Sequence, residues 1–301
     1  LAVMSAIVTG SDGVTRRHAF DIDGQSYGFE LGWGSRCARV GPLLFVMLND
    51  LMEPGPFRDA LKQEHDAQAA SQMVAQLIAR YQQRLGQLYT DHAANIVFVA
   101  PSVDVPGESL NEYTAHMIAQ MLGHAGEFAG ADVEDAGAGR GFLSVVALRL
   151  GARHVTLRDD SPELLAIARL VLHAQGWQEG THYRLVQEDV TQPPSASADP
   201  AHGPTIGLAN IGRWPDYGDA NEGIMRRWAR RPGMRLIFNG GYYFGNAGHQ
   251  EAAARVAQLL ESSGFHVQRS TDTGEGDTAP AVLIIGTRPP VATPAGPDTK
   301  D

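Results

Sequence analysis

The alternation of hydrophobic and polar positions predicts strands near the start of the chain. Over 14–31 apolar and polar residues alternate around Asp23 and Gly24, a pair that accommodates the positive φ of a tight turn, so we predict a β-hairpin there. The apolar run 41–52 has Pro42 near its start and predicts a short helix that begins at this proline. The short apolar run 95–100 predicts a strand, and the proline that follows it marks its end.

Helical spacing is clearest in the stretch 66–89. Its apolar residues recur at intervals of three and four and make one continuous stripe: Ala70, Met73, Val74, Leu77, Ile78, Tyr81, Leu85 and Leu88. Such a stripe needs a partner, which is either the neighbouring helices of the same chain or the same helix of a second copy. A further helix is predicted over 108–123.

From residue 132 onward, strands and helices alternate as in an α/β nucleotide-binding unit. The predicted strands are 132–136, 154–159, 183–190, 206–210 and 235–239, followed by a closing antiparallel pair, 265–270 and 281–287. The predicted helices are 142–150, 162–175, 219–231 and 248–263. We therefore expect a layered α/β sheet preceded by a mainly helical N-terminal region with a β-hairpin.

A glycine turn follows the first of these strands, in the pattern Asp135-x-Gly137-x-Gly139-x-Gly141. Glycines at alternate positions let backbone amides at a helix N-terminus come close to a polar ligand. Asp159 ends the next strand, 18 residues beyond Gly141, where a carboxylate can accept hydrogen bonds from two ribose hydroxyls.

Together these residues resemble the class I S-adenosylmethionine (SAM) methyltransferases, and the C-terminal part is most similar to ribosomal protein L11 methyltransferases. The resemblance implies a Rossmann-like seven-stranded SAM-binding sheet with an antiparallel last strand, and SAM as the cofactor. It implies that Asn210 lies next to the sulfonium or a substrate amine, and that Tyr113 and Thr114 cover the methionine end, although an aromatic residue at helical spacing also suits a core. The implied cofactor-binding residues are Asp135, Gly137, Gly139, Gly141, Asp159, Asp189, Asn210 and Thr114, with Asn210 and Tyr113 as catalytic residues.

Two positions depart from the family pattern. Where the family usually has aliphatic residues, Glu134 precedes Asp135 and Arg158 precedes Asp159. Because one charge alone in a strand buried on both faces costs several kcal/mol, we predict an ion pair between Glu134 and Arg158 on level positions of neighbouring strands. The alternative is that both side chains point to the solvated rim of the sheet.

Composition limits the partners. The net charge of −10 and pI near 5.5 argue against an extended nucleic-acid surface, and the cluster Arg226, Arg227, Arg230 and Arg231 suits the end of a helix. The single Cys37 excludes an internal disulfide and a cysteine-based zinc site, which fits a cytoplasmic protein. No run approaches the roughly 20 apolar residues of a membrane span.

We therefore divide the chain into a cap or dimerisation region (1–106), a SAM-binding domain (107–288) and a disordered tail (289–301). The expected activity is methyl transfer to a small molecule or an amine-bearing acceptor. Two alternatives remain: a SAM-consuming enzyme that does not methylate (cyclisation to azetidine-2-carboxylate or aminocarboxypropyl transfer), and a non-catalytic scaffold. No spacing indicates a metal site.

Overall fold

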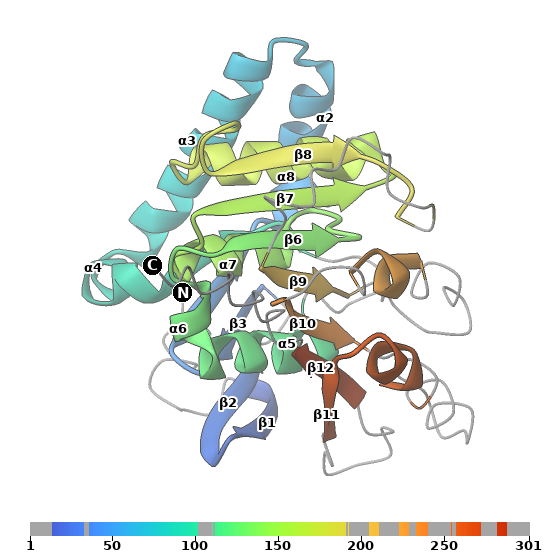
Figure 1. Ribbon diagram of the computed structural model, residues 1–301. Coiled ribbons are helices and arrows are strands. Elements are labelled where there is room, and N and C mark those ends of the chain that lie inside the picture. Colours follow the sequence, from blue (N-terminus) through green and yellow to red (C-terminus); the bar gives the residue numbers. More distant parts are fainter. Residues whose placement is uncertain are drawn as a thin grey trace, which may run out of the picture.

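The computed structural model describes residues 14–32, 36–101, 110, 112–190, 192, 205–210, 223–228, 233–239, 254, 257–271 and 282–287. Within these residues the strands form two sheets (Figure 1). The first has five strands in the order β1-β2-β3-β4-β5, and the second has seven in the order β11-β12-β10-β9-β6-β7-β8. The predicted tail, 289–301, lies outside the described residues.

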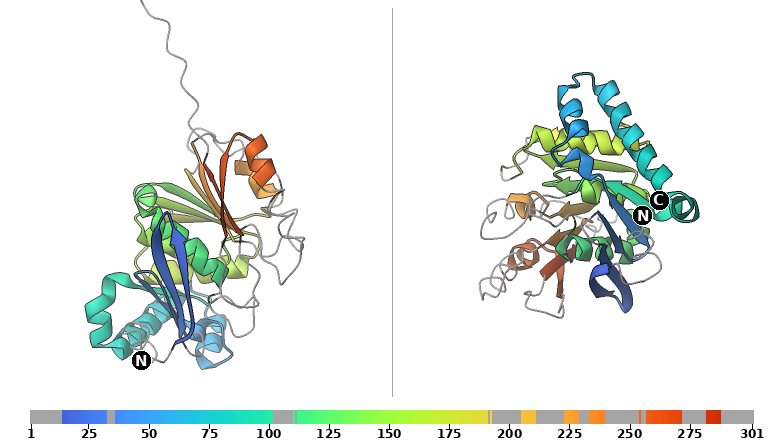
Figure 2. Two further views of the ribbon diagram at one scale, coloured as in Figure 1. Left: turned by 90° about the horizontal axis from the view of Figure 1, so that it is seen from below. Right: turned by 180° about the vertical axis from the view of Figure 1, so that it is seen from behind.

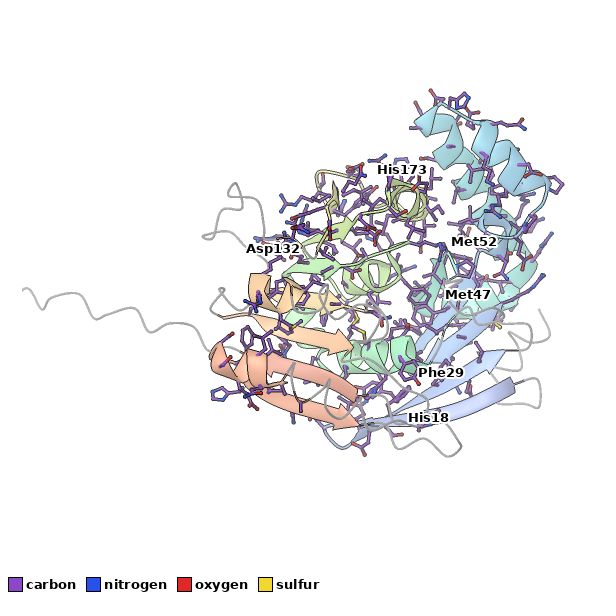
Figure 3. The ribbon with its side chains drawn as sticks, turned by 90° about the vertical axis from the view of Figure 1, so that its right-hand side faces the viewer. His18, Phe29, Met47, Met52, Asp132 and His173 are labelled. Atoms are coloured by element: carbon purple, nitrogen blue, oxygen red, sulfur yellow. The ribbon has the colours of Figure 1, made fainter. Side chains whose placement is uncertain are left out.

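The first sheet is larger than the predicted hairpin. Its strands are β1 (Val14–Ile22), β2 (Gln25–Gly32), β3 (Cys37–Val40), β4 (Leu43–Met47) and β5 (Ile96–Val99). The hairpin is confirmed, with φ of 53° at Asp23 and 81° at Gly24 in its turn. The helix predicted over 41–52 is wrong, because this run forms β4 and a short 3-10 turn, η2 (Asn49–Leu51). Phe29 and Met47, labelled in Figure 3, are fully buried in this sheet.

The second sheet confirms the predicted Rossmann-like arrangement with an antiparallel last strand. Its strands are β6 (Asp132–Ala136), β7 (His154–Asp159), β8 (Tyr183–Gln187), β9 (Ile206–Ala209), β10 (Arg235–Asn239), β11 (His266–Thr271) and β12 (Val282–Thr287). Five neighbouring strands, in the order β8-β7-β6-β9-β10, pair in parallel. Strand β12 is antiparallel to both β10 and β11. The strand order reverses direction at β6, between β7 and β9, which is where open α/β sheets bind ligands.

Helices pack between the two sheets and around them (Figure 1). The described helices are α2 (Pro56–Gln63), α3 (Ala67–Leu85), α4 (Gln87–His92), α5 (Glu112–Gly123), α6 (Ala125–Phe128), α7 (Phe142–Arg149) and α8 (Pro162–Ala174), with a 3-10 turn, η3 (Ala93–Asn95). Helix α5 contacts β10 on one side and β1, β2 and β3 on the other, so it lies between the two sheets (Figure 2). Helix α7 similarly contacts β5 of the first sheet and β6 and β7 of the second.

The predicted helix 66–89 begins at an Asp66 cap, whose side chain accepts from the Ala69 amide at 2.7 Å, and α3 ends at Gly86. Its stripe packs within the chain, since α3 lies against α8 (Figure 1) and buries Val74, Leu77 and Ile78. Intramolecular packing therefore accounts for the stripe. A homodimer through this helix stays a prediction.

Side chains from the second sheet's helices bind the outer edge of β5. The Gln175 side chain, just after α8, donates to the Phe98 carbonyl at 2.8 Å and accepts from the Phe98 amide at 3.3 Å. Arg149, at the end of α7, donates to the Ile96 carbonyl at 2.9 Å. These bonds satisfy backbone groups of an edge strand. One continuous hydrophobic core includes residues of both sheets, from Phe20 to Ile237, and so crosses the predicted domain boundary at residue 106.

The other face of the second sheet is covered by helical residues 223–228 and 257–262. Trp228 is fully buried there and packs against β9, where a Cβ added at Gly207 would approach its ring to 2.9 Å. Glycine at 207 therefore makes room for the indole. None of the helices in the described part of the chain combines the length and the hydropathy that crossing a bilayer requires.

Candidate functional site

A cavity of about 120 Å³ lies at the carboxyl ends of β6 and β9, at the reversal of strand order. Its wall is formed by Ala100, Leu110, Thr114, Asp135, Gly137, Ala138, Gly139, Arg140, Phe142, Leu143, Leu164 and Asn210. The described residues enclose less than the roughly 300 Å³ at which small-molecule pockets begin. They would therefore hold only part of a cofactor.

The glycine turn needs its glycines for two different reasons. Gly137, Gly139 and Gly141 all have positive φ, at 67°, 53° and 76°. A Cβ added at Gly139 would meet nothing within 4 Å, so this position faces open space at the cavity. A Cβ added at Gly141 would lie 3.1 Å from Leu157 and 3.2 Å from Ala168. Gly141 thus permits close packing of α7 against β7 and α8.

Asp159 holds the turn to the end of β7. One of its carboxylate oxygens accepts from the Gly139 amide at 2.8 Å and the other from the Ser161 amide at 3.0 Å. Ser161 also caps α8 by accepting from the Leu164 amide at 3.2 Å, so the predicted Ser-Pro helix start is confirmed. Asp159 is only 8% exposed. The position of the turn therefore depends on this carboxylate.

Asp135 is the buried acid of the cavity wall. Burial raises the pKa of its carboxyl to about 7, a hydrogen bond from the Ser144 hydroxyl opposes that rise, and the charge of Asp159 adds to it. The Ser144 hydroxyl lies 2.7 Å from the Asp135 Oδ2 atom. A cation bound in the cavity would favour the ionised carboxylate, so the site is suited to a positively charged group.

Asn210 and Thr114 meet across the cavity. The Asn210 Nδ2 atom donates to the Thr114 hydroxyl oxygen at 2.9 Å, which joins the end of β9 to α5. Arg140 joins the turn to the end of β5 in the same way, because its guanidinium donates to the Pro101 carbonyl at 3.1 Å. Sequence reasoning did not single out Arg140, although its place between two glycines of the turn could have indicated it.

The structure brings five of the predicted site residues onto the cavity wall and leaves four away from it. The lining includes Asp135, Gly137, Gly139, Thr114 and Asn210. It does not include Gly141, Asp159, Asp189 or Tyr113. Asp189 is exposed beyond the end of β8, and Tyr113 is buried in α5. A role in binding for each of these four stays a prediction.

The ion pair predicted between Glu134 and Arg158 is confirmed. Their Oε2 and Nε atoms are 3.1 Å apart, in an orientation that is not that of a hydrogen bond, and both residues are buried rather than at a solvated rim. The expected level register is wrong, because Glu134 is opposite Thr156 and Arg158 is opposite Ala136. The arginine side chain is long enough to span this offset.

Three further residues extend this pair. Arg158 donates to Glu188 at 2.5 Å, and Glu188 also pairs with Arg227. Trp228 donates from its indole nitrogen to the other Glu134 oxygen at 3.0 Å. Arg227 lies in the helical residues 223–228 and is 4% exposed, so this arginine is buried in a pair with Glu188. Arg230 and Arg231 lie outside the described residues, and the position of the cluster at a helix end stays a prediction.

No protein-family model matches the chain. No curated protein matches it either. Among solved structures, a ribosomal protein L11 methylase from Lactobacillus delbrueckii subsp. bulgaricus is 16% identical over 82% of this chain and 94% of that one, with a TM-score of 0.47.

Two other solved structures are similar to a little more than half of the chain. The magnesium protoporphyrin IX methyltransferase of Synechocystis PCC 6803, with bound SAH, is 17% identical over 57% of this chain and 80% of that one, with a TM-score of 0.42. The N-methyltransferase NodS of Bradyrhizobium japonicum WM9, in complex with S-adenosyl-l-homocysteine, is 14% identical over 60% and 89%, with a TM-score of 0.43. At these identities and TM-scores, none of the three structures indicates what this chain binds or does.

Proposed function

We propose that this protein is a SAM-dependent methyltransferase that acts on a small molecule or an amine-bearing acceptor. The observation that carries the proposal is the cavity at the β6 and β9 strand ends, where the glycine turn, a buried carboxylate and a side-chain amide meet. Backbone amides at a helix N-terminus bind anionic groups, and an acidic residue at the end of the next strand binds ribose hydroxyls. SAM carries both a carboxylate and a ribose.

The residues present fit this cofactor. Gly139 leaves open space beside the cavity, and the Asp135 carboxylate lies in its wall, where it would favour a cationic ligand. Each oxygen of Asp159 accepts one backbone amide and can accept another hydrogen bond, so capacity for two hydroxyls remains. When bound, SAM would supply a methyl group on a positively charged sulfur.

The chain's own task would then be to orient and desolvate the reacting groups. Thr114 fixes the side-chain amide of Asn210 at the cavity wall. From there the Asn210 carbonyl oxygen would accept a hydrogen bond from an acceptor amine and hold its lone pair toward the methyl carbon. The apolar side chains of Leu110, Phe142 and Leu143 would exclude water from the same space.

Product analysis tests this function. The protein is incubated with SAM alone and with a panel of amines and small acceptors, and the nucleoside products are identified by mass spectrometry. We expect S-adenosylhomocysteine to form only when an acceptor is added. Methylthioadenosine formed without an acceptor would instead indicate cyclisation or aminocarboxypropyl transfer, and no conversion together with no SAM binding would favour a scaffold.

A further inference from the structure

Three neighbouring strands of the second sheet carry the same two-residue arrangement at their carboxyl ends. Glu134 precedes Asp135 in β6, Arg158 precedes Asp159 in β7, and Glu188 precedes Asp189 just after β8 (Figure 1). Successive side chains of a strand point to opposite faces of its sheet. In β6 and β7 the first residue of each pair therefore faces away from the one predicted to bind the cofactor.

The residues on that opposite face form what we call the back-face network, namely Glu134, Arg158, Glu188 and Arg227. Arg158 pairs with Glu134 at 3.1 Å and with Glu188 at 2.5 Å, and Glu188 pairs with Arg227 of the helix 223–228. Two carboxylates thus alternate with two guanidinium groups, and none of the four side chains is more than 18% exposed.

This network is continuous with the glycine turn through the backbone of β7. The Arg158 carbonyl accepts from the Ala138 amide at 2.9 Å, while the Asp159 carboxylate accepts from the Gly139 amide at 2.8 Å. The Glu188 amide donates to the Asp159 carbonyl at 3.0 Å. The residues that pair on the back face therefore carry the backbone groups that fix the turn on the front face.

We propose that the back-face network is a positioning device for the cofactor site. It holds the end of β7 in register, and thereby the Asp159 carboxylate and the Ala138 and Gly139 amides, and it attaches the helix 223–228 to the same strands. Arg158, Glu188 and Arg227 are positioning residues on this account. The statement about cofactor affinity rests on the proposed function, whereas the statement about the turn does not.

A network that only stabilised the sheet would act differently. Weakening it would lower the free energy of unfolding and speed the exchange of all strongly protected amides by one common factor. A positioning network would in addition release the turn locally. The Ala138 and Gly139 amides would then exchange faster than amides elsewhere in the same sheet.

The test uses two variants of the full chain. Glu188→Gln keeps the shape of the side chain and removes the charge that bridges two arginines. Arg227→Met replaces the guanidinium with an apolar chain of similar length and leaves Glu188 paired with Arg158. The matched control is Glu30→Gln, which removes a buried charge from β2, where Glu30 accepts from the Arg39 Nε atom at 2.8 Å, away from the cavity wall.

Amide hydrogen exchange is measured by NMR without ligand, and the affinity for S-adenosylhomocysteine by calorimetry. In both network variants we expect exchange at Ala138 and Gly139 to rise at least threefold more than at the Arg235 amide, which donates to Thr205 in the same sheet. We expect the affinity to fall roughly tenfold, because small displacements of a binding group are costly. Glu30→Gln should change neither the exchange of Ala138 and Gly139 relative to that of Arg235 nor the affinity for S-adenosylhomocysteine.

Exchange at Ala138 and Gly139 that rises no more than at Arg235 in both variants would overturn the proposal. So would an affinity unchanged in both variants for a protein that binds the ligand. If the wild-type chain does not bind S-adenosylhomocysteine, the proposed function fails, and the exchange measurement alone still decides whether the network positions the turn.

Discussion

Among single residues, Asp159 has the largest expected effect on cofactor binding. Asp159→Ala should weaken SAM binding more than tenfold, because hydrogen bonds to a carboxylate contribute about 1.5–3 kcal/mol each. The variant also leaves the Gly139 and Ser161 amides without their acceptor, so the turn loses its anchor. Calorimetric titration with SAM measures the affinity.

The adjacent Asp160 provides the control for this variant, since it carries the same charge and is exposed. Asp160→Ala should leave the affinity within about twofold of the wild type, because an exposed charge contributes little. Equal losses in the two variants would mean that net charge, rather than the position of Asp159, determines binding.

The buried Asp135 predicts a dependence of stability on pH. Burial raises its pKa from 3.8 to about 7, so the folded protein binds this proton more tightly than the unfolded chain does. The stabilisation is complete below pH 3.8 and is lost as the pH rises to about 7. Asp135→Asn should flatten this fall, as measured by urea denaturation at a series of pH values. An unchanged slope in the variant would exclude Asp135 as its source.

Sequence predicted some contacts of single residues and missed others for a physical reason. The pairing of Glu134 with Arg158 could be predicted because an isolated charge in a buried strand is costly, so two such charges in neighbouring strands must meet. Glu188 and Arg227 were missed, because a helix that reaches them from far along the chain has no local pattern that identifies its partner. The repeated charged residue before each acidic one would have indicated Glu188.

At the scale of elements, the edge of β5 depends on Gln175. Gln175→Ala removes both side-chain bonds to Phe98, so we expect the free energy of unfolding to fall by about 1–3 kcal/mol. Urea denaturation measures the change. Gln178→Ala serves as the control, since that side chain is exposed, and it should cost less than about 0.5 kcal/mol. If the two variants are equally stable, the hydrogen bonds of Gln175 to β5 contribute no more free energy than the loss of side-chain entropy that they require.

The hydrophobic pattern of the sequence predicted some helices and strands better than others. The helix 66–89 has a long periodic pattern and was predicted, although Gly86 divides it into α3 and α4. The strands of the second sheet were predicted from short runs bounded by turn residues, with shifted ends. The run 41–52 is apolar throughout, and periodicity cannot separate a short buried strand from a buried helix. Its pairing with both β3 and β5 decides in favour of a strand, and these are contacts that local sequence does not contain.

At the scale of the whole molecule, the shared core predicts one cooperative unfolding transition. Helix α5 is buried between the two sheets, and Ala115, Met117 and Ile118 in it are fully inaccessible. Neither sheet can therefore unfold without exposing the core of the other. Differential scanning calorimetry should give equal calorimetric and van't Hoff enthalpies. Two separate transitions would instead support an independent domain over 1–106.

On the proposed function, the cavity beside the glycine turn binds SAM. The most direct measurement is a calorimetric titration of the wild type and of Gly139→Ala with S-adenosylhomocysteine. A Cβ at Gly139 meets open space, and its positive φ costs only about 1–2 kcal/mol, so the variant should fold. We predict saturable one-to-one binding by the wild type and at least tenfold weaker binding by the variant. No saturable binding by the wild type, or equal affinity in both proteins, would contradict the claim.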